Sequence, residues 1–263
     1  MMFNWPYLIE ILTPARSPED KTVSLLDRFA DRCRRVIDSG CGISIPDNPM
    51  GRPRYSAFEC FEATDYWPAP EKIILNLNTF HSKDELDAIL GKAAKFGIRY
   101  LLVVRGDGGP NLPRLDPLSV GGTYNIATTM DLLRYIKGEY GDQFVTGAAF
   151  NPYKPMPFEL DRAREKLEAG ADFMITQPLV GENNDVDSLR RICDDVIVEA
   201  WMSTKIELFY KSVGRMPMEE PSAYDPIKNL SELHHAYPDS CVYLSMVSFD
   251  QDWQLQLPGL ASK

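Results

Sequence analysis

Residues 84–109, DELDAILGKAAKFGIRYLLVVRGDGG, decide the fold. Residues 84–96 predict a helix, because their apolar side chains recur three and four positions apart, and Gly97 ends it. Residues 99–104 form an apolar run of the kind found in parallel strands that are buried on both faces. The glycine-rich segment 105–109 then predicts a loop. Helix, strand and loop in this order make one unit of an alternating β/α fold.

The same alternation runs along the rest of the chain. Further strands are expected at residues 7–12, 42–45, 72–77, 144–149, 171–176, 196–202 and 241–247. Further helices are expected at residues 18–38, 125–140, 158–169, 187–193 and 205–213. Prolines make residues 214–236 a loop with a weak helix at best, and the tail after Asp250 is expected to add no domain. Eight strands predict a single (β/α)8 TIM barrel over residues 1–263, whereas the alternative, a doubly wound sheet, usually has fewer strands for this length.

Composition excludes several functional classes. The formal charge of −10 and the pI near 4.9 argue against a nucleic-acid binder, which would carry a basic face. No apolar run approaches the ~18 residues of a membrane span, and the first residues do not form a secretory signal. Five cysteines without a CxxC pair indicate reduced thiols in the cytoplasm. The three histidines lack metal-ligand spacing and are expected at the surface, so no metal is predicted: His81, His234 and His235.

In such a barrel the active site lies at the carboxyl ends of the strands, and Glu10 is the clearest candidate there. An acid inside the apolar run Tyr7–Leu12 is costly to bury unless it is paired or protonated. Burial would raise its pKa, as a general acid that works near neutral pH requires. The alternative is an outward-facing acid or a structural ion pair.

The segment from Arg105 to Gly109 is the next candidate. Glycines after a buried strand let the backbone approach a ligand closely, and Arg105 can bind a phosphate through two nitrogens. Asp107 adds a negative charge at the mouth of the barrel. The alternative is a plain turn in which Arg105 and Asp107 pair with each other. Neither a P-loop nor a GxGxxG dinucleotide fingerprint is present.

Four segments resemble the catalytic barrel of methylenetetrahydrofolate reductases, over roughly residues 7–249. Residues 9–14, IEILTP, are similar to that family's first-strand FEFFPP, and residues 96–107, FGIRYLLVVRGD, to its GI…LRGD stretch. Residues 146–150, TGAAF, resemble its VAAYP, and residues 166–177, KLEAGADFMITQ, its K…AGA…ITQ. Each match alone is weak, but their common order and spacing make the likeness specific.

The resemblance implies a role for each matching residue. Glu10 is the implied acid that protonates the bridging nitrogen of 5,10-methylenetetrahydrofolate, which opens the ring to an iminium that accepts hydride and becomes 5-methyltetrahydrofolate. Asp107 is implied beside the flavin and pterin rings. Gln177 is implied to hydrogen-bond the pterin and the nicotinamide of NADH or NADPH in turn, and Trp201 is either a substrate contact or core. The residues implied to bind FAD are Asn76, Arg105, Gly106, Asp107, Phe150, Lys154 and Lys166.

The chain departs from the family pattern at several flavin-contacting positions. Residues 76–78, NLN, replace the usual His-Leu-Thr, and residues 151–155, NPYKP, replace Pro-Glu-x-His-Pro. We therefore expect FAD to bind more weakly than is usual in the family. An alternative function is a non-redox folate-binding barrel, or a subunit of a methyl-transfer complex, that has lost flavin. A homo-oligomer is compatible with either function.

Overall fold

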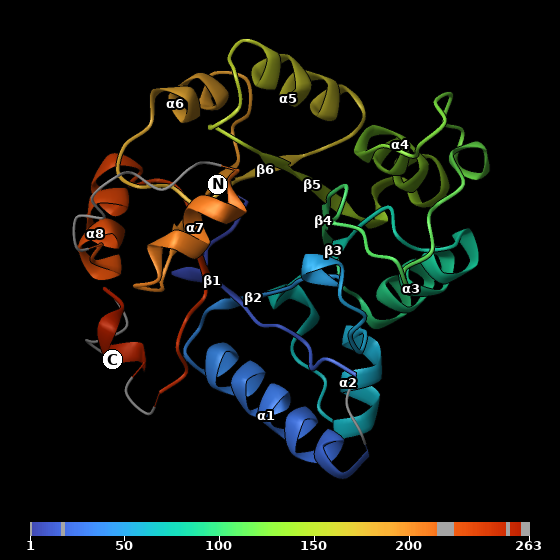
Figure 1. The fold of residues 1–263 in the computed structure, drawn as a ribbon, viewed down its shortest axis with the longest axis horizontal. Helices are drawn as coiled ribbons and strands as arrows, with labels where there is room; N and C mark the ends of the chain where they lie inside the picture. The colour runs from blue at the N-terminus through green and yellow to red at the C-terminus, as the bar shows by residue number, and fades with distance from the viewer. Residues whose placement is uncertain (1, 17–18, 215–223, 251–252, 259–263) are drawn as a thin grey trace.

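The computed structural model describes residues 2–16, 19–214, 224–250 and 253–258 and forms a closed parallel barrel (Figure 1). Each strand pairs with the next, and β1 pairs with β8 to close the ring. The predicted (β/α)8 barrel is therefore confirmed. The strands are β1 (Tyr7–Glu10), β2 (Gly42–Ile45), β3 (Ile73–Leu77), β4 (Tyr100–Val103), β5 (Val145–Phe150), β6 (Phe173–Thr176), β7 (Val196–Trp201) and β8 (Val242–Ser245).

Helices surround the barrel between successive strands (Figure 1). Short 3-10 turns lie in the connections, among them η1 (Pro49–Gly51) directly after β2. The helices are α1 (Glu19–Asp38), α2 (Ala57–Thr64), α3 (Lys83–Phe96), α4 (Thr129–Tyr140), α5 (Phe158–Glu168), α6 (Asn184–Arg190), α7 (Ile206–Ser212) and α8 (Pro226–Ala236).

Several helices differ from the sequence prediction. Helix α2 was not predicted, although Ser56 and Glu59 form a reciprocal capping box at its start. Helix α8 lies in the stretch predicted as loop: Pro226 occupies its first turn, where a missing N–H is harmless, and Asp225 caps it. Helix α4 begins at Thr129, because Thr128 and Asp131 form a capping box there, four residues after the predicted start. Pro217 and Pro221 lie outside the described residues.

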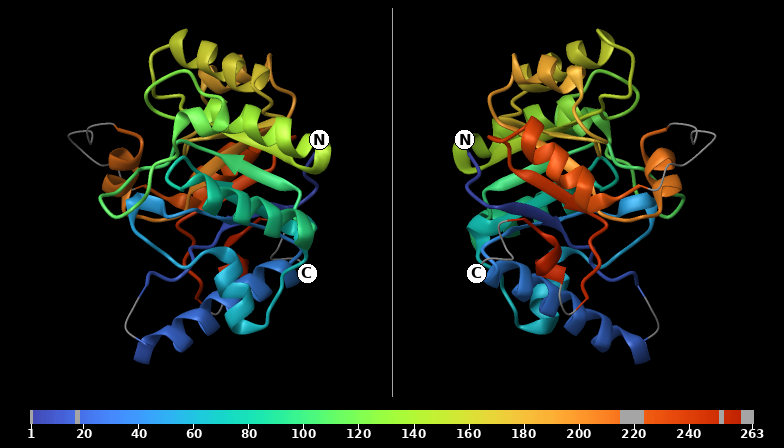
Figure 2. Two further views of the ribbon diagram at one scale, coloured as in Figure 1. Left: turned by 90° about the vertical axis from the view of Figure 1, so that its right-hand side faces the viewer. Right: turned by 90° about the vertical axis from the view of Figure 1, so that its left-hand side faces the viewer.

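Apolar side chains form two layers, one between the strands and the helices and one inside the barrel. The interior layer is closed at the amino ends of the strands by Phe3 and Trp5, which form an N-terminal plug. Phe3 packs against Tyr100 and Phe173 with ring centroids 5.0 Å apart in both pairs. Figure 2 shows the N-terminus on the side of the barrel opposite α7 and η1. The open mouth is therefore at the carboxyl ends of the strands.

The interior changes character toward the mouth. Strand side chains alternate between the two faces, so residues two apart on one strand share a face. The deeper interior positions are apolar: Leu8, Ile74, Leu102, Phe173 and Ile197. The inward positions nearer the mouth are polar on several strands: Glu10, Ser44, Asn76, Glu199 and Ser245. We call these five residues the polar layer.

None of the described helices combines the length and the hydropathy that a membrane crossing requires.

Candidate functional site

Glu10 lies at the end of β1 and faces into the mouth. The Tyr243 hydroxyl, from β8, donates a hydrogen bond to Glu10 Oε2 at 3.0 Å. Burial raises the pKa of Glu10, and the hydrogen bonds from Tyr243 and the Met246 backbone and the charge of Arg54 offset only part of this rise. The carboxyl therefore keeps its proton to a higher pH than an exposed glutamate does. Such a group can act as a general acid near neutral pH.

The polar layer continues from Glu10 onto β2 and β3. Ser44 Oγ donates to Asn76 Oδ1 at 3.1 Å. The hydroxyl of Ser44 also lies close enough to Tyr243 to lower the pKa of that phenol, which burial and the neighbouring acids raise well above its usual value. Tyr243 thus remains a hydrogen-bond donor to Glu10. Asn76, predicted to bind a cofactor, lies within this interior network and also lines a cavity of about 340 Å³ between β2, β3 and the loops that follow them.

The segment after β4 is fixed by the loop after β2. Asp107 Oδ2 accepts a hydrogen bond from the Met50 backbone N–H at 2.7 Å, although its side chain is otherwise exposed. Gly51 and Gly108 are packed so closely that a Cβ built on Gly51 would overlap the Gly108 carbonyl oxygen. Gly106 has a left-handed φ of 82°. The alternative interpretation, a turn in which Arg105 and Asp107 pair, is not what the described residues form, because the Asp107 carboxylate binds the loop after β2 instead.

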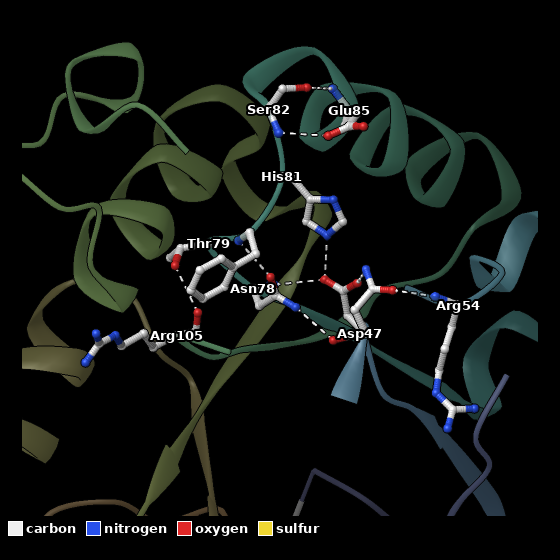
Figure 3. A network of polar contacts seen from close by, with 10 residues as sticks. Asp47, Arg54, Asn78, Thr79, His81, Ser82, Glu85 and Arg105 are labelled. Carbon is white, nitrogen blue, oxygen red and sulfur yellow. Dashed lines mark hydrogen bonds and ion pairs between the residues drawn. The ribbon is translucent and has the colours of Figure 1, made fainter. Parts of the chain in front are cut away.

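A cavity of about 300 Å³ lies beside this segment, lined by Arg105, Asp107, Gly108, Gly109 and Arg114 among others. The Arg105 carbonyl accepts from Thr79 Oγ1 at 2.9 Å, so the backbone is held while the side chain stays exposed. In Figure 3 the Arg105 side chain points away from Asp47 and His81. Two guanidinium groups beside glycine backbone suit the phosphates of a nucleotide.

His81 corrects the prediction that it lies at the surface. It is 8% exposed, and its Nε2 is 2.6 Å from Asp47 Oδ2 (Figure 3). Burial alone would lower the pKa of His81, but the hydrogen bond and charge of Asp47 raise it above the ordinary value. Asp47 Oδ2 also accepts from the Asn78 backbone N–H at 3.1 Å. Asp47 therefore joins the loops after β2 and β3. His234 is also not simply at the surface, because its Nε2 is 2.8 Å from the Tyr7 hydroxyl.

Gln177 directly follows β6, and Trp201 is the last residue of β7. Both lie at inward positions of their strands. The Gln177 backbone N–H donates to the Phe150 carbonyl at 2.7 Å, which fixes the backbone where the side chain enters the mouth. Trp201 is 6% exposed and packs against α7, with the Phe209 ring centroid 6.1 Å away. Trp201 is buried, as a core residue would be, and it also borders the mouth, as a substrate contact would. The structure is therefore compatible with both interpretations.

Two residues expected to bind flavin do not face the mouth. Phe150 is fully buried between the strands and the helices, because Gly147 and Ala149 occupy the inward positions of β5. Lys166 donates from Nζ to the Ala149 carbonyl at 2.7 Å and lies 3.6 Å from Glu159. Burial lowers the pKa of Lys166. Lys154 is exposed on the loop after β5. The residues expected to bind flavin therefore do not all lie at one site, because Phe150 and Lys166 are directed away from the mouth.

Tyr243 and Glu199 were not predicted as site residues from the sequence. Glu199 stands in the apolar run Val196–Trp201 as Glu10 stands in its own strand, so the same pattern could have found it. Tyr243 carried no such signal, because a tyrosine in a strand is ordinary. Its role depends on the pairing of β8 with β1, which is a tertiary feature.

A sequence profile of the methylenetetrahydrofolate reductase family matches residues 68–233, more than half of the chain. The chain belongs to the methylenetetrahydrofolate reductase family. The match covers β3 to β7 and includes the Arg105-Gly-Asp107 segment and Gln177. Glu10, on β1, precedes the matched residues.

Two curated members of the methylenetetrahydrofolate reductase family are similar over a shorter stretch. Methylenetetrahydrofolate reductase 2 of Saccharomyces cerevisiae is 32% identical over 118 residues, which are 42% of this chain and 18% of that protein. Methylenetetrahydrofolate reductase 2 of Schizosaccharomyces pombe is 35% identical over 107 residues, 35% of this chain and 15% of that protein. The matched segment is therefore less than a fifth of either relative. Among solved structures, 7,8-dihydropteroate synthase from Vibrio fischeri ES114 aligns with a TM-score of 0.47 at 11% identity, over all of this chain and 92% of that one.

Proposed function

We propose that this chain is a methylenetetrahydrofolate reductase-type oxidoreductase that interconverts 5,10-methylene- and 5-methyltetrahydrofolate, with residues 1–263 acting as one catalytic barrel. The observation that carries the proposal is Glu10, a carboxyl at the mouth that is held by Tyr243 and whose pKa is raised by burial. Membership of the family and the carboxyl-end position of Gln177 and Asp107 support it.

In the proposed reaction the protein supplies the proton. Glu10 transfers its proton to the bridging nitrogen of the folate, the bond from that nitrogen to the methylene carbon breaks, and Glu10 is left as a carboxylate. The cationic carbon then accepts a hydride, which a bound flavin or NADH or NADPH would supply. Tyr243 donates to the Glu10 carboxylate once the proton has left, which stabilises that state. Gln177 is the proposed hydrogen-bonding partner of the pterin.

The residues present fit only part of FAD. Arg105 and Arg114, beside Gly108 and Gly109, fit its phosphates, with exposed Lys154 as a further cation. The ring end fits less well, because Phe150 faces the helices and Lys166 binds backbone. This mismatch also favours the second candidate function, a folate-binding barrel without redox activity that serves a methyl-transfer complex.

Protein purified without added flavin is expected to be partly or wholly flavin-free. Each lost hydrogen bond to a ligand costs about 0.5–1.5 kcal/mol, so two or three losses would weaken FAD binding by roughly tenfold to a thousandfold. The absorbance spectrum, recorded before and after FAD addition and dialysis, measures this. Stoichiometric FAD that survives dialysis would contradict the expectation.

The same preparation tests the function. Reduction of 5,10-methylenetetrahydrofolate with NADH or NADPH as hydride donor, or oxidation of 5-methyltetrahydrofolate with oxidised FAD or NAD+ as hydride acceptor, supports the oxidoreductase. Folate binding by calorimetry with no turnover under any of these conditions would favour the non-redox barrel instead.

Replacing Gln177 by alanine is expected to weaken folate binding by about 1–3 kcal/mol, because a buried polar group of the pterin would lose its partner. Calorimetry with 5-methyltetrahydrofolate measures the change. Asn184→Ala, on α6 outside the mouth, is the control. Equal affinity of wild type and Gln177→Ala would exclude Gln177 from the site.

A further inference from the structure

Glu199 is a second buried acid in the polar layer, and the proposed reaction does not use it. It is 9% exposed, lies on β7 and pairs in register with Tyr243 of β8. Tyr243 is the residue that holds Glu10, so the two acids lie on either side of one phenol. When Glu10 loses its proton, its negative charge raises the pKa of Glu199 further.

Two buried donors near Glu199 in the strand register, one two residues later on β7 and one on β8, have no hydrogen-bond partner of normal geometry among the described residues. Trp201 and Ser245 are opposite each other in the β7–β8 register, and they are 6% and 3% exposed. Neither Trp201 Nε1 nor Ser245 Oγ makes a hydrogen bond of normal geometry within the described part of the chain. Ser245 lies beside the Glu199 carboxyl without completing such a bond. Buried polar atoms are nearly always paired in native proteins, so these two groups are available to bind polar atoms of a ligand.

The position of these groups argues against ordinary core packing. Ile197, two residues before Glu199 on the same face of β7, belongs to the apolar interior, as do Leu8 and Phe173 at that depth. A hydrophobic side chain at position 199 would extend this interior at no cost in unpaired polar groups. Polar side chains therefore occur only where the barrel opens, beside the partly exposed Glu10.

We propose that Glu199, Ser245 and Trp201 form a hydrogen-bonding subsite for a ring amide of the ligand, on the β7–β8 side of the mouth. This inference rests on the proposed function, in which the ring amide belongs to the pterin. The carboxamide of nicotinamide presents the same N–H and C=O, and the experiment below separates these two sources.

The protonation of Glu199 explains why an amide fits. Burial raises the pKa of Glu199 well above its usual value, the Ser245 hydroxyl offsets part of the rise, and the charge of Glu10 adds to it. A protonated carboxyl presents one O–H donor and one acceptor side by side, which is complementary to the N–H and C=O of an amide. An ionised carboxyl would accept only. The Trp201 indole and the Ser245 hydroxyl add donors for a ring oxygen or nitrogen.

The test compares Glu199→Gln with Glu199→Leu. Glutamine keeps a neutral donor and acceptor, whereas leucine keeps only the volume. We expect Glu199→Leu to bind 5-methyltetrahydrofolate at least tenfold more weakly by calorimetry at pH 7, and Glu199→Gln to stay within about threefold of wild type. Ser245→Ala, which removes only the hydroxyl oxygen, is expected to weaken binding severalfold while it folds normally. Glu168→Gln, on the exposed face of α5, is the matched control.

The pH dependence gives an independent readout. Wild-type affinity should fall as the pH rises through the raised pKa of Glu199, because the donor is lost, and the affinity of Glu199→Gln should lack this step. Wild-type affinity in the Glu199→Leu variant, or equal losses in Glu199→Gln and Glu199→Leu, would overturn the subsite. The same titrations with nicotinamide in place of folate identify the source of the amide. The ligand that loses affinity in Glu199→Leu is the one that the subsite binds.

A failure of the proposed function is distinguishable from a failure of the subsite. If wild type binds neither 5-methyltetrahydrofolate nor NADH, the proposed function fails, and free pterin and 2-pyridone then serve as ring-amide probes. Binding of either probe to wild type and Glu199→Gln but not to Glu199→Leu supports the subsite alone. Binding of neither probe overturns it.

Discussion

Replacing Glu10 by glutamine is expected to lower turnover by ~10²-fold or more, the usual contribution of a positioned proton donor. Glutamine has nearly the same shape and can still accept the hydrogen bond that Tyr243 donates to Glu10 Oε2. It cannot release a proton to the folate nitrogen. Fold and folate affinity should therefore be preserved while the chemical step is lost.

Steady-state kinetics of Glu10→Gln measures the loss of turnover, and calorimetry with folate measures whether affinity is preserved. Wild-type turnover in the direction of ring opening should also fall as the pH rises through the raised pKa of Glu10, because only the protonated form donates. Glu168→Gln, with its exposed carboxyl on α5, is the control and should behave as wild type. Unchanged turnover in Glu10→Gln would remove Glu10 from the mechanism.

Replacing Gly51 by alanine is expected to weaken ligand binding by ~10²-fold. The new Cβ would overlap the Gly108 carbonyl oxygen, so the loops after β2 and β4 must separate. That separation also breaks the hydrogen bond from the Met50 backbone to Asp107. The segment from Arg105 to Gly109 would then no longer be held in one position for a ligand.

Gly40 provides a control that separates the loss of ligand affinity in Gly51→Ala from the effect of backbone strain. Gly51 and Gly40 both have left-handed φ angles, 65° and 82°, but a Cβ on Gly40 meets nothing within 4 Å. Alanine at Gly40 should cost about 1–2 kcal/mol of folding stability through backbone strain alone, and alanine at Gly51 should cost more because of the overlap with Gly108, both measured by denaturant unfolding. Only Gly51→Ala should lose affinity in calorimetry. Equal affinities in the two variants would show that the contact between the loops does not position the site.

The strands were predictable because their signal is local. Buried parallel strands are short apolar runs, and every one of the eight predicted runs overlaps an observed strand. Helix α8 was obscured by prolines, although Pro226 is compatible with the first turn of a helix. Helix α2 is only eight residues long, so its apolar periodicity is weak, and its capping box was the better signal.

The positions of the candidate residues were predictable where one acid stood out in an apolar strand, and less so where the direction of a side chain mattered. Glu10 and Gln177 were placed at the mouth because they end strands. Phe150 also ends a strand but lies at the opposite parity from Gly147 and Ala149, and similarity to a family does not report which face a side chain takes. The pairing of His81 with Asp47 joins two loops 34 residues apart and has no local signature.

The N-terminal plug has a consequence for how the chain is made. Phe3 and Trp5 leave the ribosome well before their partners Tyr100 and Phe173, and β1 closes the ring only when β8 exists. Contacts so distant in sequence form slowly, because the chain must lose entropy before they stabilise it. Until Phe173 has emerged the ring of Phe3 lacks one of its ring partners, and until Ser245 has emerged one edge of β1 stays open to other chains. A nascent chain paused before β8 is therefore the species most exposed to aggregation, and chaperone capture would matter most at that length.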